Sequence, residues 1–187
     1  DEETAFKVEA AAIDLVGFER LTNRVIGQGA RRYGRQSIDS VHARLSSKPL
    51  TDIQHQLVLI TIDKSIDLIQ AKFGQRFDGE SDESRMALYD GTRAAWRVQP
   101  WNADQAELAL AVHDNVVIEV YRIAKWLPSG STMDSGAQRE AAANRYEFVG
   151  RLAEDGIRAH YRLKSVAHLT TRNPIRYLGP GRYLAAG

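Results

Sequence analysis

The stretch from Ala106 to Trp126 constrains the fold of this chain more than any other. It reads AELALAVHDNVVIEVYRIAKW, is rich in β-branched, aliphatic and aromatic residues, and is interrupted once, at Asp114-Asn115. Aspartate and asparagine both tolerate positive φ, so a two-residue Asp-Asn connection favours a tight turn between antiparallel strands. The sequence therefore predicts a long β-hairpin around which the rest of the chain is built.

The turn also fixes a predicted register for the hairpin. Pairing outward from the turn sets Val112 opposite Val117, Leu110 opposite Glu119, Leu108 opposite Tyr121 and Glu107 opposite Arg122. One face then carries Leu108, Leu110, Val112, Val117, Tyr121 and Ile123, and the other carries Ala109, Ala111, Val116, Ile118 and Val120. Because both faces are apolar, we expect the hairpin to be covered on both sides, as in a small barrel or a central sheet.

Composition limits the class of protein. A length of 187 residues allows one domain or slightly more, and the absence of cysteine excludes disulfides and thiolate metal sites. The five histidines have no spacing typical of a zinc site. There is no apolar run of about 18 residues, so we expect no membrane span. These features fit an intracellular protein, and we expect a cytoplasmic one.

Charge is distributed unevenly along the chain. Residues 145–187 contain eight Lys/Arg and three Asp/Glu, whereas residues 1–144 contain seventeen and twenty-one. A basic C-terminal quarter indicates either a polyanionic partner or a solvated surface.

The N-terminal residues 2–16 have helical periodicity. Their apolar side chains fill one half of a helical wheel, and Glu9 lies near the middle of that half. A carboxylate in such a position needs a cation, a metal ion or hydrogen-bond donors, because burial disfavours its charge. Glu9 is therefore either paired with a nearby arginine or part of a functional site.

A loop rich in glycine and arginine follows this helix. It begins near Asn23 and contains four arginines suited to phosphate contacts, namely Arg24, Arg31, Arg32 and Arg35. The spacing of its glycines is not that of a P-loop or a dinucleotide-binding fingerprint.

Residues 5–35, AFKVEAAAIDLVGFERLTNRVIGQGARRYGR, resemble the closing half of a GIY-YIG nuclease domain, in the subfamily found on animal LEM-domain nucleases and many bacterial proteins. In that family a helix carries a glutamate that binds the divalent metal, and an asparagine follows after a short turn. Glu9 and Asn23 match these two positions. The resemblance implies that both are catalytic residues and that Glu9 binds Mg²⁺ or Mn²⁺.

The opening part of that family's domain does not occur in this sequence. The two strands with the GIY and YIG tyrosines and the helix with the catalytic arginine would lie upstream of Asp1. We therefore expect the chain to be part of a longer protein, and we expect this part alone to be inactive as a nuclease.

The remaining residues indicate a second, α+β domain. We predict that residues 1–46 are the C-terminal, helical remainder of the nuclease-like domain, that 47–54 are a linker, and that 55–180 form a mixed β-barrel-like domain with flanking helices. The elements predicted in this second domain are a strand at 55–62, a helix from 82 or 83 to about 96, the hairpin, a strand at 145–152, a basic helix at 157–166 and a final extended piece beginning at 175.

The order strand, helix, long hairpin, strand, helix resembles the small mixed barrels of the PUA-like group, some of which bind RNA or modified bases in DNA. The segments TRAAW, RYEFVG and NPIRYL are similar to a recurring C-terminal module of bacterial nuclease-like proteins. The resemblance implies a cleft for a nucleotide or base, with candidate residues Arg93, Trp96, Arg97, Trp101 and Trp126. The alternative for each tryptophan is packing in the core, and the alternative for Arg93 is a structural ion pair.

The basic helix at 157–166 supplies a further candidate surface. Arg158 and Arg162 are four residues apart and would share one helix face, with Lys164 on the next. These side chains are candidates for contacts with a phosphate backbone. Two functions are thus open. One is the C-terminal portion of a metal-dependent DNA endonuclease with an attached nucleic-acid-binding domain, and the other is a non-catalytic PUA-like module that binds nucleic acid or a modified nucleotide.

Overall fold

The structure is a computed structural model that describes residues 4, 5, 8, 45–63, 65, 66, 81–133, 142–169 and 171–180. The chain divides into two compact units, Asp1–Leu45 and Ser46–Gly187. In the first unit Thr4, Ala5 and Val8 are helical, in agreement with the helix predicted there.

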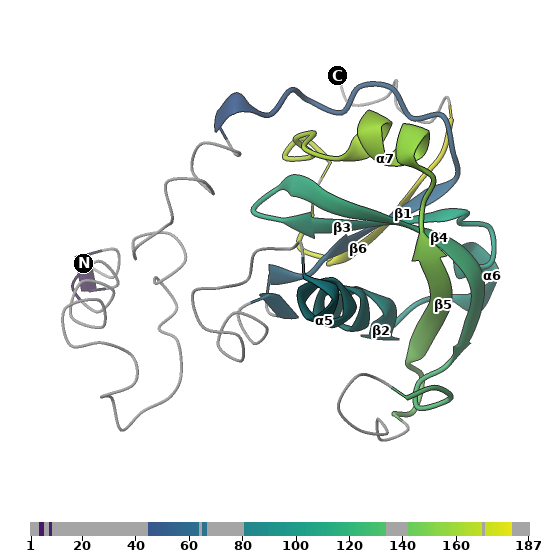
Figure 1. The fold of residues 1–187 in the computed structure, drawn as a ribbon. Helices are drawn as coiled ribbons and strands as arrows, with labels where there is room; N and C mark the ends of the chain where they lie inside the picture. Colours follow the sequence, from purple (N-terminus) through teal and green to yellow (C-terminus); the bar gives the residue numbers. More distant parts are fainter. Residues whose placement is uncertain are drawn as a thin grey trace. The chain divides into compact units, whose positions relative to one another are not determined.

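The second unit is a mixed α+β fold built on one sheet. Its elements, labelled as in Figure 1, are β1 (Leu57–Thr61), α5 (Asp82–Arg93), β2 (Ala94–Trp96), α6 (Pro100–Ala103), β3 (Leu108–His113), β4 (Val116–Pro128), β5 (Tyr146–Leu152), α7 (Asp155–Tyr161) and β6 (Ile175–Leu178).

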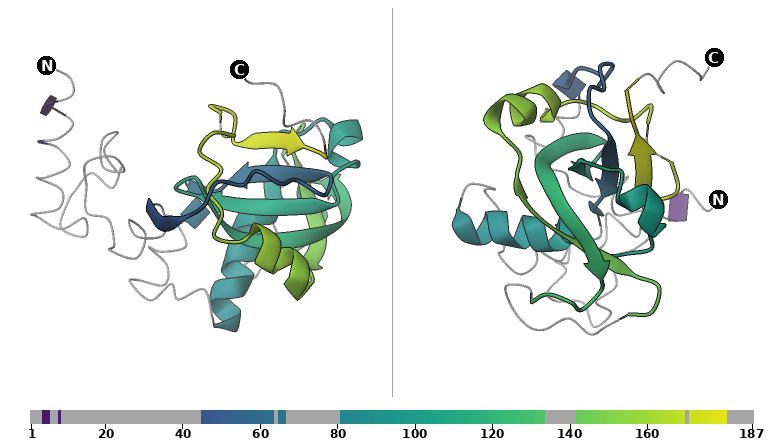
Figure 2. Two further views of the ribbon diagram at one scale, coloured as in Figure 1. Left: turned by 90° about the horizontal axis from the view of Figure 1, so that it is seen from above. Right: turned by 90° about the vertical axis from the view of Figure 1, so that its right-hand side faces the viewer.

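Six strands form a curled, half-barrel sheet in the order β2-β5-β4-β3-β1-β6. All neighbours are antiparallel except β1 and β3, which run parallel with Leu57 opposite Leu108. The sheet curls around its long central strand β4, which bends along its length (Figure 2). Gly150 of β5 lies opposite Ile123 of β4, next to a shift in the pairing register of the two strands. A Cβ at Gly150 would collide with the carbonyl oxygen of Arg122.

Both faces of the central hairpin are covered, as its apolar pattern predicts. One core lies on the side of α7 and contains Leu110, Val112 and Tyr161. The other lies on the side of α5 and contains Leu88 and Phe148. Figure 1 shows the two helices on opposite sides of the sheet. Burial on two faces explains why the hairpin sequence is apolar throughout rather than alternating.

The predicted turn is confirmed, but the register beyond it is wrong by one residue. Asp114 and Asn115 adopt φ of 48° and 63°, and Val112 lies opposite Val117 as expected. A β-bulge between Ala111 and Val112 then shifts the pairing, so that Leu110 lies opposite Val120. One extra residue in a strand moves every later side chain to the other face.

The bulge changes which residues of β4 share a core. Val120 packs on the α7 side with Leu110, whereas Tyr121 and Ile123 pack on the α5 side. The predicted faces were the reverse for these three residues. Close packing of Tyr121 against Tyr89 and Phe148, with ring centroids 5.3 and 6.3 Å apart, accompanies this shift.

The predicted helix at 82–96 overshoots the observed one. It ends at Arg93, and Ala94–Trp96 form the edge strand β2 beside β5. Pro100 does not merely end a helix, because it begins the short helix α6. Proline suits this first helical position, where no amide hydrogen is needed.

The predicted helix at 157–166 is displaced and shorter. The observed helix α7 spans Asp155–Tyr161, so neither Arg162, which caps its end in an extended conformation, nor Lys164 lies on it with Arg158. The segment predicted as a linker is closely packed in its second half, since Leu50 and Ile53 belong to the α7-side core.

Candidate nucleic-acid interface

The residues that carry the nuclease resemblance lie outside the described part of the chain. These are Glu9 and Asn23 together with Arg24, Arg31, Arg32 and Arg35. The other candidates belong to the second unit, where each has a defined environment.

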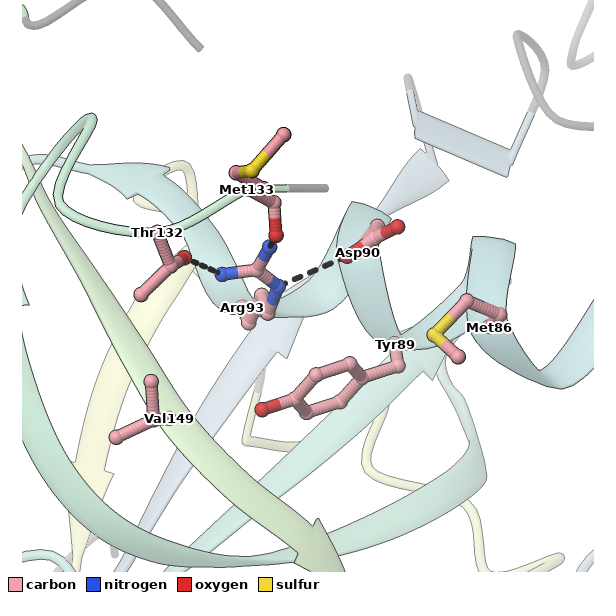
Figure 3. A pocket seen from close by; sticks show the side chains of 7 residues that line it. All are labelled: Met86, Tyr89, Asp90, Arg93, Thr132, Met133 and Val149. Atoms are coloured by element: carbon pink, nitrogen blue, oxygen red, sulfur yellow. Dashed lines mark hydrogen bonds and ion pairs between the residues drawn. The ribbon is translucent and has the colours of Figure 1, made fainter. Parts of the chain in front are cut away.

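Arg93 is a structural cross-link. Its side chain is 3% exposed and its Nε donates to Asp90 Oδ1 at 2.9 Å. Its terminal nitrogens donate to Thr132 Oγ1 and, at 2.7 Å, to the carbonyl of Met133 (Figure 3). The guanidinium also lies 5.4 Å from the ring centroid of Tyr89. Arg93 thus ties the end of α5 to the segment after β4, which matches the ion-pair interpretation.

A second buried charge supports the same segment. Glu147 is fully buried and accepts hydrogen bonds from the amides of Gly130 and Thr132 and from the Thr132 hydroxyl. The Arg93 guanidinium and the Glu147 carboxylate therefore both form hydrogen bonds with Thr132. Specific donors and acceptors thus satisfy the hydrogen-bonding needs of both buried charged groups.

An open hollow of about 360 Å³ adjoins this network (Figure 3). Its lining consists of Met86, Tyr89, Asp90, Arg93, Thr132, Met133 and Val149. Burial raises the pKa of Tyr89, whose hydroxyl is held between the amide and carbonyl of Gly150. The hollow is mainly a shallow apolar surface with its polar groups already engaged.

The three tryptophans do not gather at this hollow. Trp126 is 6% exposed and packs with the partly buried Trp96 in the α5-side core, where Trp96 Nε1 donates to the Thr92 carbonyl at 2.7 Å. Trp101 is exposed on α6, and Arg97 is exposed between β2 and α6. The core-packing alternative therefore holds for two of the three.

Arg158 is bound by an acid from the hairpin. Its Nε and one terminal nitrogen each donate to a carboxylate oxygen of Glu119 at 2.9 Å, and Glu119 is 7% exposed. The hydrogen bonds to Glu119 raise the pKa of Arg158. Arg158 thus docks α7 on β4 and presents little of its charge to a partner.

The residues that follow α7 form an exposed basic loop, Arg162–Leu163–Lys164, here called the 162–164 loop. Arg162 is 42% exposed, and its Nε donates to the Ile118 carbonyl at 3.1 Å and lies 3.5 Å from Glu119 Oε1. Lys164 is partly exposed, and among the described residues its ammonium has no ion-pair partner. These two side chains retain charge for an external anion.

The 162–164 loop is fixed by backbone hydrogen bonds on two sides. The Leu163 amide donates to the Val117 carbonyl at 2.8 Å, and the Val117 amide donates to the Lys164 carbonyl at 3.0 Å. On the other side the Ser165 amide donates to the carbonyl of Lys48, an exposed residue, at 2.8 Å. A third cation, from a segment distant in sequence, therefore lies beside the loop.

Sequence reasoning missed the residue at the centre of this loop. Leu163 is 61% exposed and has a φ of 58°, in the left-handed region. Nothing in the sequence marks it, because leucine has no preference for that conformation. Only the backbone geometry identifies it.

A separate cluster lies at the tip of the hairpin. His113 Nδ1 is 3.1 Å from Asp63 Oδ1, and His113 Nε2 is 3.6 Å from Asp114 Oδ2. Parallel pairing of β1 and β3 brings their carboxyl ends, and hence these side chains, together. One nitrogen and two carboxylate oxygens within 4.8 Å are ligand types that Zn²⁺ or Mn²⁺ accepts. Asp63 also accepts the Asp114 amide at 3.2 Å, which supports the turn.

Comparison of the chain with protein-family models, with curated proteins and with solved structures gives no match. Within the described residues, no helix is long and apolar enough to cross a membrane.

Proposed function

We propose that the second unit binds nucleic acid, most directly double-stranded DNA, and that it is the binding domain attached to the C-terminal part of a GIY-YIG-type endonuclease. The observation that carries the binding proposal is the set of three basic residues at the 162–164 loop, the exposed Lys48 and Arg162 and the partly exposed Lys164. The basic balance of residues 145–187 supports it.

Phosphate contact is the chemistry that this surface fits best. Backbone hydrogen bonds hold the main chain of this loop and the main chain of Lys48 close together, and of the three basic residues only Arg162 has a carboxylate partner among the described residues, with its Nε 3.5 Å from Glu119. Cations held in this way neutralise phosphates and release counterions, a term that depends on salt and not on base sequence.

The catalytic part of the proposal rests on the sequence resemblance. Glu9 would hold Mg²⁺ or Mn²⁺, and Asn23 would belong to the same site. The reaction implied is hydrolysis of a phosphodiester in DNA. It also needs the tyrosines and the arginine of the family's opening half, so this chain alone is expected not to cleave.

A non-catalytic PUA-like module is the second candidate. The observation that favours it is the hollow beside α5, with the exposed Met86 and Met133 at its edge. Flexible methionines adapt to varied apolar ligands, including the face of a base. In this case binding would be lost on substitution at the hollow and retained on substitution at the 162–164 loop.

The binding proposal is tested by fluorescence anisotropy with a labelled DNA duplex over a salt series. In the double variant Lys48→Ala with Lys164→Ala, the slope of log K against log salt should become less negative by about 0.9 for each phosphate contact removed. Lys125→Ala is the matched control, since it removes an exposed lysine from the far half of β4. Equal slopes for wild type and the double variant would show that the surface is merely solvated.

The catalytic proposal has its own test. Supercoiled plasmid with Mg²⁺ or Mn²⁺ should remain intact with this chain, and a chain extended upstream through the missing strands should nick it. Replacing Glu9 with Ala in the extended chain should abolish nicking. Nicking that survives this replacement would exclude Glu9 from the site.

A further inference from the structure

Leu163 is an exception among the residues with left-handed backbone. The described part of the chain has four non-glycine residues with positive φ, and the other three are Asp114, Asn115 and Asn144. Aspartate and asparagine reach this region readily, whereas a leucine there is strained by its Cβ. A glycine or asparagine at 163 would satisfy the same backbone with less strain.

The surroundings of Leu163 do not explain why a leucine is present. Its side chain is 61% exposed, so it contributes little to either core. Its amide donates to the Val117 carbonyl, and its two neighbours are also held, since the Val117 amide donates to the Lys164 carbonyl and the Arg162 amide donates to the Arg158 carbonyl at 2.8 Å. The scaffold therefore enforces the conformation, while the side chain is directed to solvent. Strain that persists at an exposed residue of this kind is a sign of function.

The flanking charges identify the kind of partner. Leu163 lies between Arg162 and Lys164 in the sequence, and the backbone of Lys48 is hydrogen-bonded to the next residue but one, Ser165, so three basic residues lie close to this exposed leucine along the backbone. Proteins that deform duplex DNA combine these features, because cations hold the phosphates while an apolar wedge enters between two base pairs.

We propose that Leu163 is such a wedge. It enters the base stack of a DNA duplex from the minor groove and kinks it, while Arg162, Lys164 and Lys48 hold the phosphates on either side. This inference rests on the proposed binding function and adds the form of DNA that is recognised, a duplex at a step that unstacks easily. Pyrimidine–purine steps such as TA are the most easily kinked.

An anionic membrane surface is the competing partner for an apolar tip among cations. Peripheral membrane binding uses a broad apolar face, typically along an amphipathic helix. Here the helix before the loop has seven residues, and within the described residues 145–169 Leu163 is the single exposed large hydrophobic residue. One leucine suits a gap between base pairs better than a bilayer.

The test uses the full chain, with Leu163→Gly, Leu163→Asn and the conservative Leu163→Met. Affinity is measured by anisotropy on a duplex with a central TA step, and bending is measured by energy transfer between dyes at the duplex ends. Leu163→Gly and Leu163→Asn should weaken binding by about 10-fold and abolish bending while leaving the salt slope unchanged, because the phosphate contacts remain. Leu163→Met should retain both affinity and bending.

Folding stability separates this role from a structural one. Relief of backbone strain should raise the Tm of Leu163→Gly by about 1–4 °C even as binding falls. A lower Tm together with weaker binding would mean that Leu163 is structural, and this would overturn the proposal.

The remaining outcomes are also decisive. If wild type binds the duplex with a salt-dependent affinity, and Leu163→Gly binds and bends it equally well, the wedge is wrong and the proposed binding function stands. If wild type shows no salt-dependent binding to duplex, the proposed function itself is wrong. Leucine-dependent sedimentation with phosphatidylserine vesicles, without duplex bending, would assign the tip to a membrane surface and overturn the wedge.

Discussion

The turn of the central hairpin and the 162–164 loop use the same left-handed backbone in opposite ways. At the turn, Asp114 and Asn115 have φ of 48° and 63°, and both residue types are well suited to it. In the loop, Leu163 has φ of 58° and is poorly suited. The two regions are adjacent, since the Val166 amide donates to the Asn115 carbonyl at 2.8 Å.

This contrast in side-chain preference indicates different roles for the turn and the loop. Residues at the turn agree with their backbone, so folding alone accounts for them. A leucine in the left-handed region costs roughly 1–2 kcal/mol, which folding alone does not account for. Substitutions that separate stability from binding therefore test whether the two regions differ in this way.

The largest expected effect comes from removing the support beneath the loop. Glu119→Ala would leave Arg158 with only the exposed Asp155, 3.4 Å from a terminal nitrogen, as its carboxylate partner, and would remove an acceptor from the Val120 amide. Breaking one side of a buried ion pair is strongly destabilising, and with Arg158 22% exposed we expect a loss of about 2–3 kcal/mol. Urea denaturation monitored by circular dichroism measures this loss.

Hydrogen exchange in the same variant tests whether the two regions are separable. The Leu163 amide should exchange faster than in wild type, whereas the Val166 amide, which is bonded to the turn, should change less. Equal acceleration at both amides would show that the turn and the loop unfold together.

The second largest effect is expected at the turn. Asn115→Val places a β-branched residue at positive φ and should destabilise the protein by about 1–2 kcal/mol. Asn115→Gly, which keeps the turn geometry, is the control and should stay within about 0.5 kcal/mol of wild type. A tolerated valine would mean that the turn rearranges easily, and the contrast with Leu163 would then lose its basis.

A smaller effect of opposite sign is expected in the loop. Leu163→Gly should increase the free energy of unfolding by about 0.5–1 kcal/mol, since the relief of strain exceeds the entropic cost of glycine. Leu163→Ala keeps the Cβ strain and should change stability less. Thermal denaturation of both variants beside wild type measures the difference.

The smallest effect is expected in the pH dependence of stability, through Glu154 at the N-cap of α7. Hydrogen bonds from its own backbone amide and from Arg122 and Arg151 lower the pKa of Glu154 to about 2 from an ordinary 4.5. A lowered folded-state pKa stabilises the fold above pH 4.5, and this contribution is lost as pH falls from 4.5 to about 2.

The matching experiment compares the Tm of wild type and Glu154→Gln across that pH range. The difference between them should narrow on acidification and vanish at its lower end. It should also be small, because Glu154 is exposed and water screens its ion pairs. A difference that is constant with pH would mean that Glu154 acts through packing rather than charge.

Much of the second unit could be predicted from local sequence. The Asp114-Asn115 turn was found because those residue types determine its geometry, and the strands at 57–61, 146–152 and 175–178 were found from their apolar or β-branched composition. The bulge in β4 could not be found, because it results from packing on both faces of a hairpin that is apolar throughout. The spacing of side chains predicts a helix through Ala94–Trp96. These residues form a strand instead, because pairing with β5, a tertiary contact, overrides their helical propensity.

The candidate site was less predictable than the fold. Arg162 and Lys164 could be chosen from charge alone, but the pairing of Arg158 with Glu119 depends on residues 39 positions apart. Lys48 lies beside the loop because its carbonyl accepts a hydrogen bond from the Ser165 amide, more than a hundred residues later in the sequence. No sequence pattern predicts a role for Leu163, because what sets it apart is a leucine side chain on a left-handed backbone, which only the structure reveals.

The place of β1 in the sheet has a consequence for synthesis of the chain. β1 lies between β3 and β6, so one of its edges remains open until the last strand, Ile175–Leu178, has been made. Residues 57–62, LVLITI, are uncharged and rich in β-branched side chains, a composition that favours pairing with other chains. An incomplete nascent chain therefore exposes an unpaired, aggregation-prone edge of β1, and pairing with β6 covers this edge.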